Sequence, residues 1–179
     1  MKKYELINKE EKCLCGRDIT MYQIRALVDI PEHHVMFGDI GGWIEKEENL
    51  SHEGDCWINT TGYVFDNAQV SENAVVGQYQ WSWEEEIPED AYVFGNAQVK
   101  GDSVVWGPAR VTNNCVIDGY THVVGEVCGH AHITGEAAVY GFVGGRAIIK
   151  GNSVIFEDAT VYGETVVDNK RLKSGVFVK

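Results

Sequence analysis

One apolar position recurs every six residues along most of the chain, and a small residue stands two places before it. The repeated residue is Val or Ile at all eighteen positions. A period of six fits neither the α-helix nor the heptad of a coiled coil. Val and Ile suit short β segments, so the pattern predicts a repetitive all-β solenoid. The positions are Ile58, Val64, Val70, Val76, Val93, Val99, Val105, Val111, Ile117, Val123, Val127, Ile133, Val139, Val143, Ile149, Ile155, Val161 and Val167.

Between the apolar positions, turn residues recur in pairs such as Gly95-Asn96 and Gly151-Asn152. Gly and Asn tolerate the left-handed backbone conformations that tight turns need. The combined pattern, small-x-Val/Ile-x-Gly/Asp/Glu-Asn, resembles the hexapeptide repeat of left-handed parallel β-helix proteins over about residues 56–168. The resemblance implies three hexads per triangular coil and left-handed winding, although parallel crossovers in general prefer the right hand.

The leading segment adds a second resemblance. Residues 41–44, 49–51 and 54–58 read GGWI, NLS and GDCWI, similar to a group of uncharacterised bacterial and prophage hexapeptide-repeat proteins. Earlier still, residues 3–7 and 19–30 alternate apolar and polar side chains around a Cys-Gly-Arg-Asp turn. Alternation on both sides of a turn predicts a β-hairpin.

Together these patterns predict a single-stranded left-handed parallel β-helix of about six coils with an N-terminal hairpin cap. At about 4.8 Å per coil the prism would be roughly 29 Å long. We expect residues 1–57 to form the hairpin and capping segment and residues 58–168 to form the β-helix. An inserted loop at 78–91 interrupts the helix, and residues 169–179 form a C-terminal cap.

Three irregularities fall at one corner of the predicted triangle. The insertion separates Val76 from Val93, and two later connections, after Val123 and after Val139, are shortened to four residues. Loops that interrupt a solenoid tend to lie on its binding side. We expect a recess there, lined by glycines at 125 and 141, with binding side chains that offer indole stacking and cationic contacts. The expected binding residues are Trp81, Trp83, Arg110 and His122. The alternative is a solvated loop whose tryptophans pack on the solenoid.

One outer side of the predicted prism is apolar along nearly its full length. An apolar stripe of that extent is not expected to remain in water. We expect it to be covered either by other subunits or by the N-terminal hairpin folding back over it. The pattern favours a homo-oligomer, a trimer or a dimer. The residues expected at the interface are Trp57, Val75, Val104, Trp106, Val124, Tyr140, Val154 and Phe156.

Histidines are the candidate catalytic groups. Many hexapeptide-repeat proteins are acyltransferases that use coenzyme A or an acylated carrier, and a histidine there acts as general base on the acceptor. The resemblance therefore points to His122 and His130 as candidates, with His132 as a third. No acyltransferase site motif surrounds them, so an ordinary surface histidine remains the alternative for each.

The net charge and the cysteine content limit the kinds of molecule that the protein is expected to bind. The net charge of −12 disfavours direct binding to nucleic acid or an anionic membrane, and it suits a basic protein partner. Cys13 and Cys15, with His33 and His34, could hold zinc, but no second cysteine pair exists, so no metal is expected. No apolar segment reads as a signal peptide or a membrane span, and we expect a cytoplasmic location.

Three functions remain open from the sequence. The first is a non-enzymatic oligomeric binding protein, conceivably a phage anti-defence protein that sequesters a small anionic ligand or blocks a basic nucleic-acid-binding protein, with no cofactor. The second is a coenzyme A-dependent acyltransferase, which the fold resemblance implies. The third is a structural or assembly protein.

Overall fold

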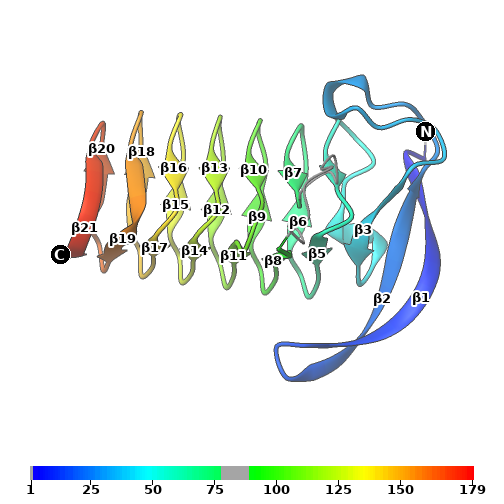
Figure 1. The fold of residues 1–179 in the computed structure, drawn as a ribbon, viewed down its shortest axis with the longest axis horizontal. Coiled ribbons are helices and arrows are strands. Elements are labelled where there is room, and N and C mark those ends of the chain that lie inside the picture. Colours follow the sequence, from blue (N-terminus) through cyan, green and yellow to red (C-terminus); the bar gives the residue numbers. More distant parts are fainter. Residues whose placement is uncertain (1, 78–88) are drawn as a thin grey trace.

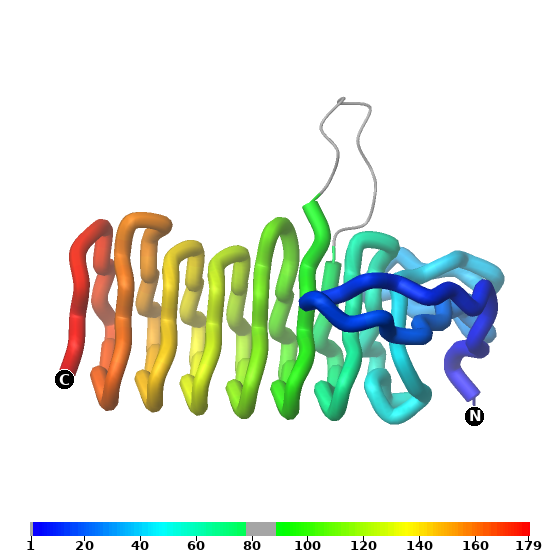
Figure 2. The backbone as a smooth tube through the Cα atoms, turned by 90° about the horizontal axis from the view of Figure 1, so that it is seen from below, coloured from blue at the N-terminus to red at the C-terminus, as the bar shows by residue number. Residues whose placement is uncertain are grey.

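The computed structural model describes residues 2–77 and 89–179 as a left-handed parallel β-helix of about seven turns with a hairpin at its N-terminal end (Figure 1). The short strands stack in three rows along the axis, which we call stacks 1, 2 and 3. The outward side of each stack is face 1, 2 or 3. The tube view shows the coils following one another along the axis (Figure 2).

The strands of the three stacks have the following bounds. Stack 1 holds β4 (Trp57–Ile58), β7 (Val75–Val76), β10 (Val104–Val105), β13 (His122–Val123), β16 (Ala138–Val139) and the first residues of β19 (Val154–Tyr162) and β21 (Arg171–Val178). Stack 2 holds β3 (Ile40–Ile44), β5 (Gly62–Val64), β8 (Ala91–Val93), β11 (Arg110–Val111), β14 (Glu126–Val127), β17 (Phe142–Val143) and the later residues of β19 and β21. Stack 3 holds β6 (Gln69–Val70), β9 (Gln98–Val99), β12 (Val116–Ile117), β15 (His132–Ile133), β18 (Ile148–Lys150) and β20 (Val166–Asp168).

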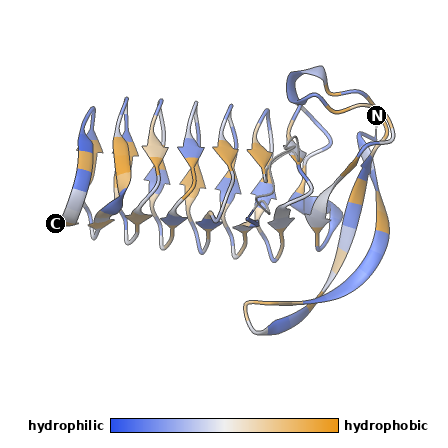
Figure 3. Ribbon diagram, viewed as in Figure 1, coloured by the Kyte–Doolittle hydropathy of each residue, from blue (hydrophilic) through white to orange (hydrophobic). Residues whose placement is uncertain are grey.

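The hexad residues form the core. Every one of the eighteen Val and Ile side chains is at most 2% exposed. Orange, hydrophobic segments lie on the short strands, where they occur beside blue, hydrophilic ones, and the turns at the corners are mostly blue to white (Figure 3). Hydroxyl groups at the small positions are satisfied locally, since Thr121 Oγ1 donates to Ser103 Oγ at 3.0 Å and Ser103 Oγ donates to Lys100 O at 2.6 Å. The predicted all-β solenoid is therefore confirmed.

The ladder is slightly longer than the hexads predict. Before the first hexad, Ile44 pairs in register with Val64 and Leu50 forms a bridge to Val70. After the last hexad, Leu172 and Phe177 of β21 pair with β19 and pack against the core. Ile44 and Leu50 are six residues apart, but Leu50 stands eight residues before Ile58, and Leu172 and Phe177 follow Val167 at intervals of five. All four therefore fall outside the hexad series, and about seven turns form where about six are expected.

The predicted hairpin is confirmed, and it lies over face 2. β1 (Tyr4–Leu14) and β2 (Arg17–Ala26) pair antiparallel, and β2 pairs antiparallel with β3. Ile19 and Met21 of β2 join Trp43 and Phe65 in a second apolar cluster, which also contacts Leu14, Tyr63, Tyr92 and Phe94. The hairpin thus covers the aromatic start of face 2 and leaves most of face 1 open.

The N-terminal end is closed by polar contacts to main-chain atoms. It includes the short helices η1 (Pro31–His33) and η2 (Glu47–Asn49). Buried Tyr4 donates its hydroxyl to Leu50 O at 2.8 Å, and buried Lys3 donates its ammonium to Cys56 O at 2.8 Å. The ring of His52 stacks on Tyr4 at 4.3 Å and accepts the Lys3 backbone N–H at its Nδ1, 3.3 Å away. Neither short helix is long or apolar enough to cross a membrane, nor is any other helix among the described residues.

Close backbone packing fills the corner between stacks 1 and 2 at the shortened connections. A Cβ atom on Gly125 would overlap the carbonyl oxygen of Gly141, and one on Gly141 would overlap that of Phe156. The expected recess lined by these glycines is therefore wrong. They bring adjacent coils together at the tight corner, where any side chain would separate them.

Burial of two histidines at the N-terminal end makes stability depend on pH. Burial lowers the pKa of His52 and of His33, whose Nε2 lies 3.1 Å from Asn73 O. The unfolded chain therefore takes up protons first as the pH falls below about 6.5, and the folded state loses stability there. We expect the free energy of unfolding, measured with urea, to be lower near pH 5.5 than near pH 7.5. The double variant His33→Gln/His52→Gln should show a flatter profile, and an unchanged slope would contradict the assignment.

The corner packing predicts the effect of one added methyl group. Gly125→Ala should lower the free energy of unfolding by about 1–3 kcal/mol, because the coils must separate to accept the side chain. Glu126→Ala is the control, since Glu126 is exposed, and it should change stability by less than about 0.5 kcal/mol. Equal stability of the two variants in urea unfolding would show that the corner is looser than the structure indicates.

Candidate functional site

Face 1 is the candidate surface, and its two ends differ. Trp57 and Val75 are only 1% and 8% exposed, so they belong to the core of the protomer itself. Their expected place in a subunit interface is corrected accordingly. From β10 onward the outward side chains reach the surface. Val104, Val124, Val154 and Phe156 are half-buried, while Trp106 and Tyr140 are exposed.

The two covers considered for face 1 can now be compared. The hairpin packs on Phe65 and Phe94 of face 2, which the contacts of Ile19 and Met21 establish. It therefore does not cover the stretch of face 1 from Val104 to Phe156. Self-association through this stretch stays a prediction.

His122 is the histidine of face 1. It lies exposed in β13, in register between Val104 of β10 and Ala138 of β16. Its ring meets that of Tyr120 edge-on, with centroids 6.2 Å apart. No carboxylate hydrogen-bonds this ring within the described part of the chain. A polar imidazole thus stands among the apolar side chains that face 1 carries from Val104 to Phe156.

The other two candidate histidines lie elsewhere. His130 is exposed in the turn between β14 and β15, where its backbone N–H donates to Gly145 O at 2.6 Å. His132 is half-buried on face 3 between Val116 and Ile148, and its Nε2 is buried without a hydrogen-bond partner among the described residues. The three histidines are therefore far from sharing one site, because His122 lies on face 1, His130 in a corner turn and His132 on face 3.

The expected binding cluster at the insertion corner is only partly described. Trp81 and Trp83 lie outside the described residues. Arg110 projects from β11 on face 2, where its guanidinium lies 5.5 Å from the ring centre of Tyr92. His122 lies on face 1, so the structure does not bring Arg110 and His122 to one face.

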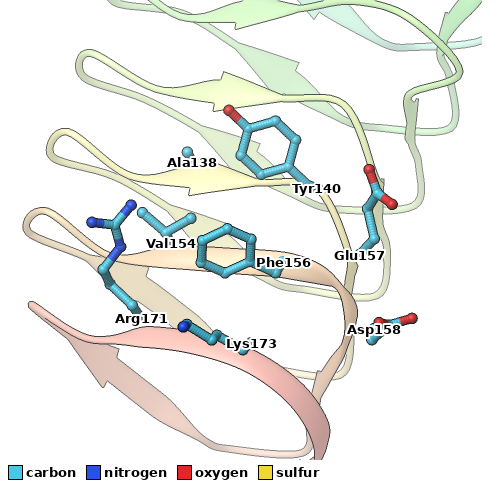
Figure 4. Close-up of a pocket in the computed structure, with 8 residues that line it drawn as sticks. All are labelled: Ala138, Tyr140, Val154, Phe156, Glu157, Asp158, Arg171 and Lys173. Atoms are coloured by element: carbon cyan, nitrogen blue, oxygen red, sulfur yellow. The ribbon is translucent and has the colours of Figure 1, made fainter.

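A hollow of about 570 Å³ opens at the C-terminal end of face 1, and we call it the C-terminal hollow (Figure 4). Its floor is apolar and aromatic, with the rings of Tyr140 and Phe156 6.4 Å apart. Arg171 and Lys173 lie along its β21 side, and the Arg171 guanidinium is 5.8 Å from the Phe156 ring centre. Its lining is Ala138, Tyr140, Val154, Phe156, Glu157, Asp158, Arg171 and Lys173.

Sequence reasoning missed the two cations of this hollow. Arg171 pairs in register with Val154, so it belongs to face 1 only because β21 adds a rung beyond the last hexad. The signal that could have placed it is Leu172, an apolar residue that continues the core position of stack 1.

The cysteines and histidines form no evident metal centre. No group of three His, Cys, Asp or Glu side chains is placed to hold a metal ion within residues 2–77 and 89–179. Cys13 and Cys15 are exposed near the hairpin turn, while His33 contacts Asn73 O beside the first coils. Cys115 is buried at a small hexad position, and burial raises the pKa of its thiol to about 12, which makes it unreactive.

A comparison with known proteins finds a relative by sequence. No protein-family model matches the chain. Over 123 residues the chain is 29% identical to a protein of Escherichia coli (strain K12) described as the uncharacterised acetyltransferase YdcK. The match covers 66% of this chain and 30% of that protein, so the chain spans less than a third of the relative's length. The chain thus has a β-solenoid fold and an acetyltransferase-like relative.

Proposed function

We propose that the chain takes part in acyl transfer from coenzyme A to a hydroxyl or amine, with face 1 as the reactive surface and His122 as general base. The observation that carries the proposal is the position of His122, exposed at the centre of a face that the hairpin leaves open. The acetyltransferase-like relative supports the same reaction class, although the chain covers only 30% of it.

The surroundings of His122 suit a base. Val104 and Ala138 flank it along the stack, so a covering chain or substrate would exclude water from an apolar strip around the imidazole. Within the described residues the ring keeps both nitrogens free of protein hydrogen bonds, so one can accept a proton. An orienting carboxylate would have to come from whatever covers face 1.

The proposed step is balanced without any further reactant. The acceptor oxygen or nitrogen attacks the thioester carbonyl while His122 takes its proton. The carbon–sulfur bond then breaks, the acyl group stays on the acceptor, and His122 returns the proton to the sulfur of coenzyme A.

The other functions are less supported by the described residues. A binding role at the insertion corner, including an anti-defence role, stays a prediction because two of its four residues lie outside the described part of the chain. A purely structural role has no observation of its own beyond the regular solenoid.

Substitution of single histidines tests the proposal. With acetyl-coenzyme A and a panel of hydroxyl and amine acceptors, we expect His122→Ala to lower the rate by about 10²–10⁴-fold, the usual contribution of a general base. His130→Ala is the matched control, since His130 is also exposed but lies at a corner away from face 1. It should retain the wild-type rate.

Two results would reject the proposal. One is the absence of any acetylated product with the folded wild-type protein across the panel. The other is a His122→Ala rate equal to that of His130→Ala, which would make His122 an ordinary surface residue.

A further inference from the structure

The loop between β2 and β3 holds two large apolar side chains in water. Met36 is 67% and Phe37 is 70% exposed, and we call this pair the N-terminal knob. Single exposed apolar residues are common, but these two lie side by side on one loop, which makes them a candidate contact surface.

The knob is held in place by hydrogen bonds. Asp39 Oδ2 accepts the Met36 N–H at 2.8 Å, and Asp29 Oδ1 accepts the Phe37 N–H at 2.7 Å. Gly38 N donates to Ala26 O at 2.9 Å, which ties the loop to β2. Because the loop is already ordered, little conformational entropy is lost when its side chains enter a pocket.

Charge distinguishes the two ends of the solenoid. The loop that carries the knob contains Asp29, Glu32 and Asp39 and no lysine or arginine, and burial lowers the pKa of His33. By contrast, residues 169–179 hold four of the chain's fifteen lysines and arginines and none of its 27 acidic residues.

The C-terminal hollow offers apolar and cationic contacts that suit the knob and its acidic loop. It offers an open volume of about 570 Å³ over the aromatic rings of Tyr140 and Phe156. Arg171 and Lys173 stand on its β21 side, and Glu157 and Asp158 lie at the right-hand edge of the view, where Asp158 pairs in register with Ser174, the residue after Lys173 (Figure 4). An acidic loop would therefore approach from the β21 side, with its apolar tip over the rings.

We infer that the N-terminal knob of one copy docks into the C-terminal hollow of a second copy. The knob and the hollow lie at opposite ends of the solenoid, about seven coils or roughly 34 Å apart, so a chain cannot fill its own hollow (Figure 1). The contact is head-to-tail, and each copy keeps one free knob or one free hollow. Such an association grows into a ring or an open array with rising concentration.

This inference does not rest on acyl transfer. It specifies which part of face 1 a second copy covers, from Ala138 to β21, and His122 lies one coil beyond that part. A contact of two apolar side chains and a few charges is small, so we expect it to be weak and to weaken further in high salt.

Sedimentation velocity over a micromolar to near-millimolar series tests the contact. The wild-type protein should grow in mass with concentration, and Phe37→Ser should weaken this association by about tenfold or more, since it removes the central apolar anchor. Tyr162→Ser is the matched control, because Tyr162 is an exposed aromatic residue on face 2, away from both surfaces. It should associate like the wild type.

A mixing experiment identifies the geometry. Phe37→Ser lacks the knob and keeps the hollow, while Arg171→Glu keeps the knob and places a like charge at the hollow. Each alone should fail to associate, and an equal mixture should form pairs and nothing larger. Near-ultraviolet and far-ultraviolet circular dichroism of each variant establishes that it is folded.

Other outcomes overturn the inference. A wild-type mass that does not change with concentration shows that no such contact forms. A closed dimer or trimer that survives Phe37→Ser indicates side-by-side packing through face 1 instead. Binding of coenzyme A that Arg171→Glu abolishes, without any self-association of the wild type, would make the hollow a small-molecule site.

Discussion

The hydrogen-bond ladder between coils is the constraint on which this structure depends. Outward-facing residues donate their backbone N–H to the next coil, as Val104 does to Thr121 O at 2.8 Å and His122 to Ala137 O at 3.0 Å. The ladder fixes the position of every strand relative to its neighbours. Any change in chain length must therefore be absorbed at a corner, because a shift within a stack would turn buried side chains outward.

The core of the fold could be predicted because it depends on one repeated environment. Each hexad Val or Ile meets the same surroundings, so its spacing is visible in the sequence. Ile44, Leu50, Leu172 and Phe177 occupy equivalent positions at the two ends of the ladder. Eight residues separate Leu50 from Ile58 and five separate Val167 from Leu172, so the six-residue spacing does not lead to them. Only the strand pairing in the structure shows that these residues extend the core.

The candidate site was harder to predict, because it depends on which of two apolar faces the hairpin covers. Face 1 begins with Trp57 and Val75, and face 2 begins with Tyr63 and Phe65, so hydrophobicity alone did not decide between them. Ile19 and Met21 pack on Phe65, so the hairpin covers face 2. Face 1, which carries His122, is therefore left open. Glycines 125 and 141 were misjudged for a related reason, since a short connection was read as empty space when the next coil fills it.

At the corner between stacks 1 and 2, the number of residues in a coil changes while the register of the strands does not. Eighteen residues separate Val105 from Val123, yet only sixteen separate Val123 from Val139, and both pairs align in the same stack. When this corner gains or loses two residues, the strands that follow therefore keep the same side chains facing the core. The corner is thus the place where the circumference of the coil changes along this chain while the pairing within each stack stays the same.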